Sequence, residues 1–114
     1  MYDAIIIGAR CAGSPLGMLM ARSGHRVLVV DRATFPSDAL STHAVTGDAP
    51  ERIARWGLWE TVTARTAPTQ GTRFGVQGQV FDIPGVSVSP RRTVLDKILD
   101  DAAREAGAEV REGF

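Results

Sequence analysis

The stretch Asp3–Ser14, DAIIIGARCAGS, decides the fold of this chain. Its apolar and β-branched beginning, Asp3–Ile7, predicts a short buried strand. Gly8 and Gly13 follow at the spacing of the first and third glycines of a dinucleotide-binding turn. Arg10 stands where that turn has its second glycine. The stretch therefore predicts a nucleotide-binding turn with one substituted position.

Each glycine of such a turn has its own physical role. The first lets the chain leave the strand sharply, the second lets the backbone approach a pyrophosphate, and the third lets the following helix pack on the strand. The start of that helix offers free N–H groups and a partial positive charge to the anion. Gly8 and Gly13 keep the first and third roles, whereas Arg10 loses the close approach. A plain tight turn between strand and helix is the alternative interpretation.

The segments after the turn complete a β–α–β unit. Cys11–Ser23 predicts a helix that ends at Gly24, and Arg26–Val30 predicts a second buried strand. The residues that we expect on the buried face of the helix are Ala12, Leu16, Leu19 and Met20. Asp31 ends the second strand, where a carboxylate about 20 residues beyond the turn accepts a ribose hydroxyl. A solvated acid at a strand end is the alternative for Asp31.

The rest of the chain leaves this alternation. After the irregular segment Arg32–Thr46, Asp48 is expected to cap a short helix, and Gly71–Pro84 predicts a β-hairpin. Val94–Ala106 has the regular apolar stripe of a helix, and Ala108–Arg111 predicts a last strand. The fold class is therefore α/β, a Rossmann-like βαβ fold with an added β-hairpin.

Two arginines open the last predicted helix. Cations at a helix N-terminus oppose the helix dipole, and Arg91 and Arg92 stand at this position. Arginine is well suited to bind a phosphate. These residues therefore predict an anionic partner, with solvent screening as the alternative.

Composition narrows the function classes. The 114 residues carry no formal net charge at pH 7, which gives no indication of a nucleic-acid partner. No apolar run has the length of a membrane span, and no basic leader of a signal peptide precedes the first strand. One cysteine and two histidines cannot form a metal site. With a single cysteine, Cys11, we expect a cytoplasmic protein without disulfides.

The order of the motifs resembles a known family. DAIIIGARCAGS is followed by RVLVVDR at Arg26–Arg32, by FPSDALSTH at Phe35–His43 and by RRTVLDKILDDAAREAGAEV at Arg91–Val110. This order is similar to the N-terminus of FAD-dependent oxidoreductases of the p-hydroxybenzoate hydroxylase-like group, which includes geranylgeranyl reductases and flavin-dependent halogenases. The resemblance covers essentially the whole chain.

The resemblance implies an FAD site. Gly8 and Gly13 would line the pyrophosphate, Asp31 would hold the adenosine ribose, and the segment Ser37–His43 would run towards the flavin. We also expect Arg10 to contact the FAD, at a phosphate or nearby. The complete set of cofactor-binding residues that it implies is Gly8, Arg10, Cys11, Ala12, Gly13, Asp31, Arg32 (near the adenine), Ser41, Thr42 and Arg92.

The function expected from the resemblance is the FAD-binding part of a flavin-dependent oxidoreductase. Such a parent enzyme hydroxylates an organic substrate with oxygen or reduces a carbon–carbon double bond, with NAD(P)H as electron donor. We expect residues 1–114 to be the N-terminal part of an FAD-binding domain, without the substrate domain and the C-terminal part of the parent. Alternatives are a non-catalytic nucleotide-binding module and, less favoured, an NAD-dependent Rossmann dehydrogenase, because the β–α–β alternation stops after Asp31.

Two side chains invite a chemical role that we do not assign. His43 is titratable and lies in the loop that would approach the flavin, but we interpret it as a polar loop residue. Cys11 opens a helix, where the dipole would lower its thiol pKa, but we interpret it as a small packing residue. No catalytic residue is identified from the sequence.

Overall fold

Three parallel strands form the sheet that the sequence predicts. In the computed structural model, which describes all residues 1–114, the sheet contains β1 (Ala4–Ile7), β2 (Val27–Val30) and β5 (Glu109–Arg111) in the order β1-β2-β5. Ala4 pairs with Val27, and Leu28 pairs with Glu109. The middle strand is buried along its whole length. This is the arrangement of half of a doubly wound sheet.

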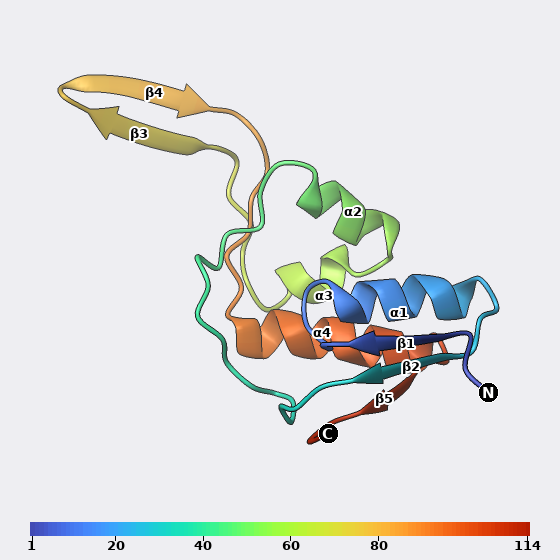
Figure 1. Cartoon of the computed structure of the whole chain (residues 1–114). Helices are drawn as coiled ribbons and strands as arrows, with labels where there is room; N and C mark the ends of the chain where they lie inside the picture. The colour runs from blue at the N-terminus through green and yellow to red at the C-terminus, as the bar shows by residue number, and fades with distance from the viewer. The chain divides into compact units, whose positions relative to one another are not determined.

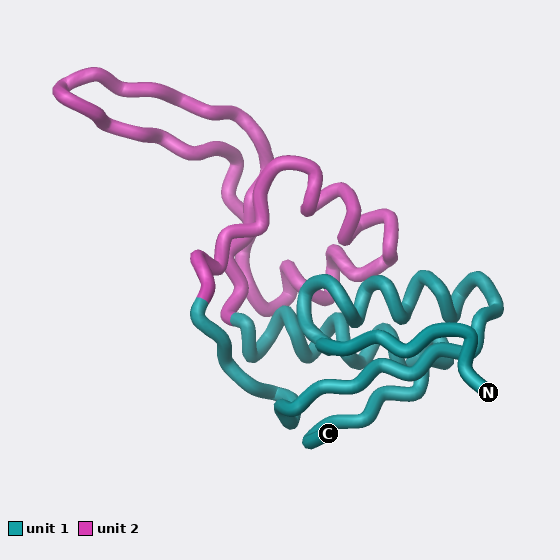
Figure 2. The backbone as a smooth tube through the Cα atoms, viewed as in Figure 1, with its two compact units in different colours: residues 1–40, 92–114 teal, residues 41–91 magenta.

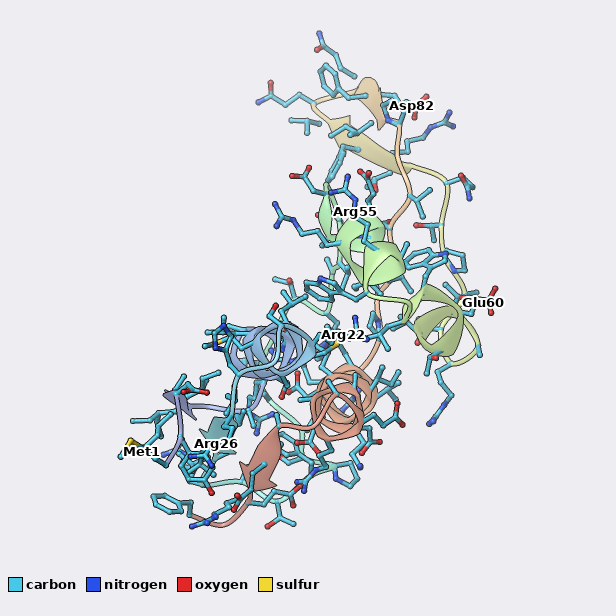
Figure 3. The ribbon with its side chains drawn as sticks, turned by 90° about the vertical axis from the view of Figure 1, so that its right-hand side faces the viewer. Met1, Arg22, Arg26, Arg55, Glu60 and Asp82 are labelled. Atoms are coloured by element: carbon cyan, nitrogen blue, oxygen red, sulfur yellow. The ribbon has the colours of Figure 1, made fainter.

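The sheet belongs to one of two compact units. Unit 1 contains Met1–Leu40 and Arg92–Phe114, and unit 2 contains Ser41–Arg91 (Figure 2). In unit 1, helices α1 (Gly13–Arg22) and α4 (Arg92–Glu105) lie on the same face of the sheet (Figures 1 and 3). The core of this unit consists mainly of Met18, Val27, Leu28, Val29, Val30, Leu95, Leu99, Ala102, Ala103 and Val110.

The face of α1 that packs on the sheet differs from the one expected. Leu16 and Leu19 are 49% and 41% exposed, so the predicted apolar face Ala12, Leu16, Leu19 and Met20 is wrong. The buried residues of the helix are Gly13, Ser14, Pro15, Gly17 and Met18. A Cβ added at Gly17 would lie 2.7 Å from Val29 Cγ2. The helix therefore packs so closely on the strands that only small residues fit between them.

The ends of α1 test two further expectations. The helix begins at Gly13 and not at Cys11, which belongs to the preceding turn. Its end at Gly24 is confirmed, because Gly24 has a φ of 88° and its N–H donates to the carbonyl of Ala21 at 2.9 Å. Glycine adopts this left-handed conformation without steric cost.

Unit 2 contains two short helices and the predicted hairpin. The helices are α2 (Ala49–Arg55) and α3 (Trp59–Thr63), of which α3 was not predicted. The strands β3 (Thr72–Val76) and β4 (Gln79–Ile83) pair antiparallel. Gln77 and Gly78 form the turn with φ angles of 49° and 79°, the conformation of a tight hairpin turn.

Two aspartates of unit 2, Asp48 and Asp82, pair with arginines. The expected cap at Asp48 is wrong, because its side chain makes no capping hydrogen bond and instead lies 4.0 Å from the guanidinium of Arg52. On the hairpin, Asp82, labelled in Figure 3, pairs with Arg73 at 2.7 Å.

None of the helices combines the length and apolar character needed to cross a membrane.

Candidate functional site

The turn between β1 and α1 depends on two glycines. Gly8 has a φ of 104°, and its N–H donates to the carbonyl of Val30 at 2.7 Å. A Cβ added at Gly13 would lie 1.6 Å from the carbonyl oxygen of Gly8, so no larger residue can begin the helix there. The first glycine thus shapes the turn and the third allows close packing, as the motif predicts.

The start of α1 offers unopposed backbone dipoles. No side chain caps this helix end, and its first turn contains no acidic residue. Ser14 is buried, but its hydroxyl donates to the carbonyl of Ala9 at 2.9 Å instead of accepting from the first turn. A helix N-terminus in this state favours an anion.

Asp31 is a buried carboxylate fixed by the backbone. Its Oδ2 accepts from the N–H of Ala9 at 2.7 Å, and its Oδ1 accepts from the N–H of Ala33 at 2.8 Å. The residue is 9% exposed. Each carboxylate oxygen has a second lone pair, so Asp31 can accept from a ligand while it orders the turn and the loop after β2.

These residues border a pocket at the carboxyl ends of β1 and β2. The pocket has a volume of about 330 Å³ and is lined by Ile7, Gly8, Arg10, Val30, Asp31, Arg32 and Phe114. Open parallel sheets bind ligands at this edge, and the volume is that of a small ligand pocket. The structure therefore brings Gly8, Arg10, Asp31 and Arg32 together.

A second group of side chains converges on Asp96 of α4. Asp96 is fully buried. Its Oδ2 accepts from Arg10 Nη1 at 2.7 Å, and its Oδ1 accepts from Arg92 Nε at 2.8 Å. The thiol of Cys11 also donates to Oδ1, at 3.3 Å. We call these four residues the Asp96 cluster.

The Asp96 cluster explains two residues that the sequence left open. Arg92 pairs with the carboxylate one turn along its own helix, and this hydrogen bond raises the pKa of Arg92; a phosphate partner of Arg92 stays a prediction. Cys11 is exposed as a residue, but its sulfur is partly buried. This partial burial, followed by the hydrogen bond to Asp96, raises the pKa of the thiol to about 11. The expectation that the helix start lowers this pKa is therefore wrong, because partial burial and the carboxylate of Asp96 both favour the neutral thiol.

Arg10 also contacts the loop after β2. Its Nη2 donates to Ser37 Oγ at 2.6 Å, its Nη1 lies 3.4 Å from the carbonyl oxygen of Ser37, and its guanidinium carbon lies 5.2 Å from the centre of the Phe35 ring. Ser37 was predicted only as the beginning of the segment that would run towards the flavin, and Asp96 was not among the predicted site residues. The available signal for Asp96 was an acid inside the apolar stripe of α4, four residues after Arg92.

Of the remaining predicted residues, Ala12 is the N-cap residue of α1, and Ser41 and Thr42 belong to unit 2. Ser41 Oγ accepts from the N–H of His43 at 3.1 Å, and His43 Nδ1 is buried without a hydrogen-bond partner. The expected approach of Ser41 and Thr42 to the cofactor stays a prediction. No three His, Cys, Asp or Glu side chains are grouped so that they could hold a metal ion.

Comparison with known proteins identifies relatives of the whole chain. Residues 1–114 match the family described as FAD binding domain. Menaquinone reductase of Mycolicibacterium smegmatis is 30% identical over 117 residues, which cover 97% of this chain and 29% of that protein. Digeranylgeranylglycerophospholipid reductase 2 of Methanopyrus kandleri is 29% identical over 115 residues, which cover 96% of this chain and 27% of that protein.

The solved structures to which this chain is similar are also flavin-dependent enzymes. The flavin-dependent brominase Bmp2 matches with a TM-score of 0.84 and 29% identity, over 96% of this chain and 28% of the brominase. The myxobacterial chondrochloren halogenase CndH, an FAD-dependent halogenase, matches with a TM-score of 0.85 and 25% identity, over 98% and 28%. The chain thus spans less than a third of each of these proteins. The fold, the nucleotide turn and the match over all 114 residues together establish that the chain belongs to the FAD binding domain family.

Proposed function

We propose that the chain forms the FAD-binding part of a flavin-dependent oxidoreductase that acts on a small organic substrate. The proposal rests above all on one observation, the pocket of Gly8, Arg10, Asp31 and Arg32 beside the uncapped start of α1. The parent reaction is of the monooxygenase or carbon–carbon double-bond reductase type, with NAD(P)H as electron donor. Relatives named as reductases, a brominase and a halogenase support this range.

The residues present fit the cofactor. Gly8 leaves open space where a Cβ would stand, so the backbone of the turn can approach a pyrophosphate. The N–H groups at the start of α1 would bind that anion. Asp31, oriented by the N–H groups of Ala9 and Ala33, would accept from the ribose hydroxyls, with Arg32 on the adenine side. When bound, FAD supplies the electron transfer, while the protein orients it and tunes its surroundings.

Further residues complete the proposed site. Cys11 and Ala12 would offer backbone N–H groups next to Gly13, and Ser41 and Thr42 would also contact the cofactor. Arg92 would contribute positive charge from α4. We further propose a cytoplasmic location, because the single cysteine, Cys11, is free and free thiols are typical of the reducing cytoplasm.

A titration with FAD tests the proposal. The protein, expressed from its complete gene, should be yellow and should take up FAD after it has been stripped of cofactor. Gly13→Ala should weaken FAD binding by at least about tenfold, because its Cβ would displace the turn. Gly75→Ala is the matched control, since its Cβ meets no atom within 4 Å. A colourless protein that takes up no FAD would overturn the proposal.

Alkylation of Cys11 tests where the cofactor binds. Cys11 lies exposed in the turn, so bound FAD should protect its thiol from a maleimide in the wild-type protein. Binding without protection would contradict the assignment of the turn, and this readout stays informative if Gly13→Ala does not fold. Calorimetry with FAD, NAD and ADP, together with an assay of NAD(P)H oxidation, separates the oxidoreductase from the alternative, a nucleotide-binding module without turnover.

A further inference from the structure

Arg10 occupies the position of a glycine but connects three separate segments. It follows Gly8 in the nucleotide turn, its Nη1 bonds Asp96 of α4 at 2.7 Å, and its Nη2 bonds Ser37 Oγ at 2.6 Å. The guanidinium carbon also lies over the ring of Phe35, 5.2 Å from its centre. The side chain is only 27% exposed. Its donors are thus directed towards protein groups.

The partner at the far end of Arg10 is rigid. Asp96 is fully buried and is held a second time by Arg92. Hydrogen bonds between arginine and a carboxylate are charge-assisted and stronger than neutral ones, so Arg10 and Arg92 restrain the Asp96 side chain from two sides. Arg10 is therefore anchored on α4, and its remaining donors can hold the loop after β2.

The loop that Arg10 holds starts at the proposed cofactor site. Asp31 fixes one end of it through the N–H of Ala33, and Glu112 accepts from the N–H of Phe35 at 3.2 Å. Arg10 is the next contact along the chain, at Phe35 and Ser37. Without Arg10, the loop would keep its first anchors and lose those at the Phe35 ring and the Ser37 hydroxyl.

From this geometry we propose that Arg10 is a positioning residue, which ties the loop Ala33–Ser37 to α4 and so preorganises the cofactor site. The inference rests on the proposed FAD function of the turn. It replaces the expected direct contact with a phosphate as the main role of this side chain. An arginine is needed because only its planar fork reaches Asp96 and Ser37 at the same time.

Hydrogen exchange in the cofactor-free protein tests the proposal directly. Arg10→Met should accelerate exchange of the Phe35 amide by about tenfold. This N–H bonds only the side chain of Glu112, and the loop should open more often once the contacts of Arg10 with the Phe35 ring and Ser37 are lost. Arg10→Lys should protect this amide less than arginine does, because an ammonium cannot bridge both partners. Arg26→Met, at an exposed arginine outside the site, is the matched control and should exchange like the wild type.

FAD affinity supplies the second readout. Arg10→Met should weaken FAD binding by about tenfold, the cost of ordering one or two side chains on binding. Unchanged exchange in both Arg10 variants would overturn the positioning role, and unchanged exchange with weaker FAD binding would point to direct contact. Faster exchange in a protein whose wild type binds no FAD would instead overturn the proposed function and leave the positioning role intact.

Discussion

Helix α4 buries two carboxylates, whose hydrogen-bonding groups are satisfied differently. Asp96 and Asp100 lie one turn apart and are both fully buried. Asp96 accepts from Arg10, Arg92 and Cys11. Asp100 accepts only from Arg104, at 3.0 Å, and its Oδ1 has no partner.

The two environments differ in how strongly they favour an ionised carboxylate. Burial raises the pKa of Asp100 above its ordinary value, and the bond to Arg104 offsets this only in part. Around Asp96, three donors converge on two oxygens, so only an acceptor-only group fits there. The two carboxylates are equally buried but are expected to contribute differently to stability, because the number of hydrogen-bond donors around each decides whether its negative charge is compensated.

Asp96→Asn should have the largest effect on stability. The amide would turn an N–H group towards donors of the Asp96 cluster and leave two arginines without their counter-charge. Breaking buried ion pairs in this way costs about 3 kcal/mol in free energy of unfolding, measurable by urea denaturation. Asp101→Asn is the control on the same helix, because Asp101 pairs with Lys97 at the surface.

The control should change the unfolding free energy by less than about 0.5 kcal/mol. Equal losses for Asp96→Asn and Asp101→Asn would show that the donors around Asp96 add nothing beyond an ordinary surface pair. The contrast between the two buried carboxylates of α4 would then have no energetic basis.

Local patterns explain which parts of the fold could be predicted. The turn at Gly8, the stop at Gly24 and the hairpin turn at Gln77 and Gly78 depend on the conformational freedom of a few adjacent residues, and all are visible in the sequence. The face of α1 was not visible. Periodicity assumes that large apolar side chains face the core, whereas Gly17 brings α1 so close to Val29 that the leucines point away.

In the candidate site, too, residues close together in sequence could be predicted, whereas contacts between distant segments could not. Gly8, Gly13 and Asp31 follow from one β–α–β unit and could be predicted from spacing alone. The partners of Arg10 could not, because Asp96 lies 86 residues away in sequence and Ser37 lies 27 residues away. Only the packing of α4 beside the turn brings these groups together.

The second largest effect is expected for the reactivity of the Cys11 thiol, which should respond to a substitution of Asp96 but not to one of Asp100. After burial, the hydrogen bond and the negative charge of Asp96 are the causes that raise the pKa of this thiol to about 11. Asp96→Asn removes the charge, so the pKa should fall. The rate of alkylation at pH 8 should then rise by about threefold per pKa unit, because the larger thiolate fraction is partly offset by the lower nucleophilicity of a less basic thiolate. The rate is measured with iodoacetamide below the unfolding transition.

Asp100→Asn is the control for the thiol experiment, because Asp100 makes no contact with Cys11. Its alkylation rate should equal that of the wild type. A similar acceleration in both variants would mean that loosening of α4, and not the charge of Asp96, governs the thiol.

The smallest effect is expected for the stability of Asp100→Asn. The amide oxygen can still accept from Arg104, and no buried charge remains, so the free energy of unfolding at pH 7 should change by at most about 1 kcal/mol. Because the folded pKa of Asp100 is raised, the folded protein binds the proton more tightly than the unfolded chain does. The contribution of this group is therefore fully present below pH about 4 and is lost as pH rises through the folded pKa.

Urea denaturation of both proteins from pH 3.5 to pH 8 measures this dependence. Other acids, such as Glu109 and Asp82 with lowered pKa values, contribute with the opposite sign in both proteins and cancel in the difference. The advantage of the wild type over Asp100→Asn should shrink as pH rises. A difference that grows with pH would mean that the Arg104 pair outweighs burial, and Asp100 would then resemble Asp96 in needing its charge.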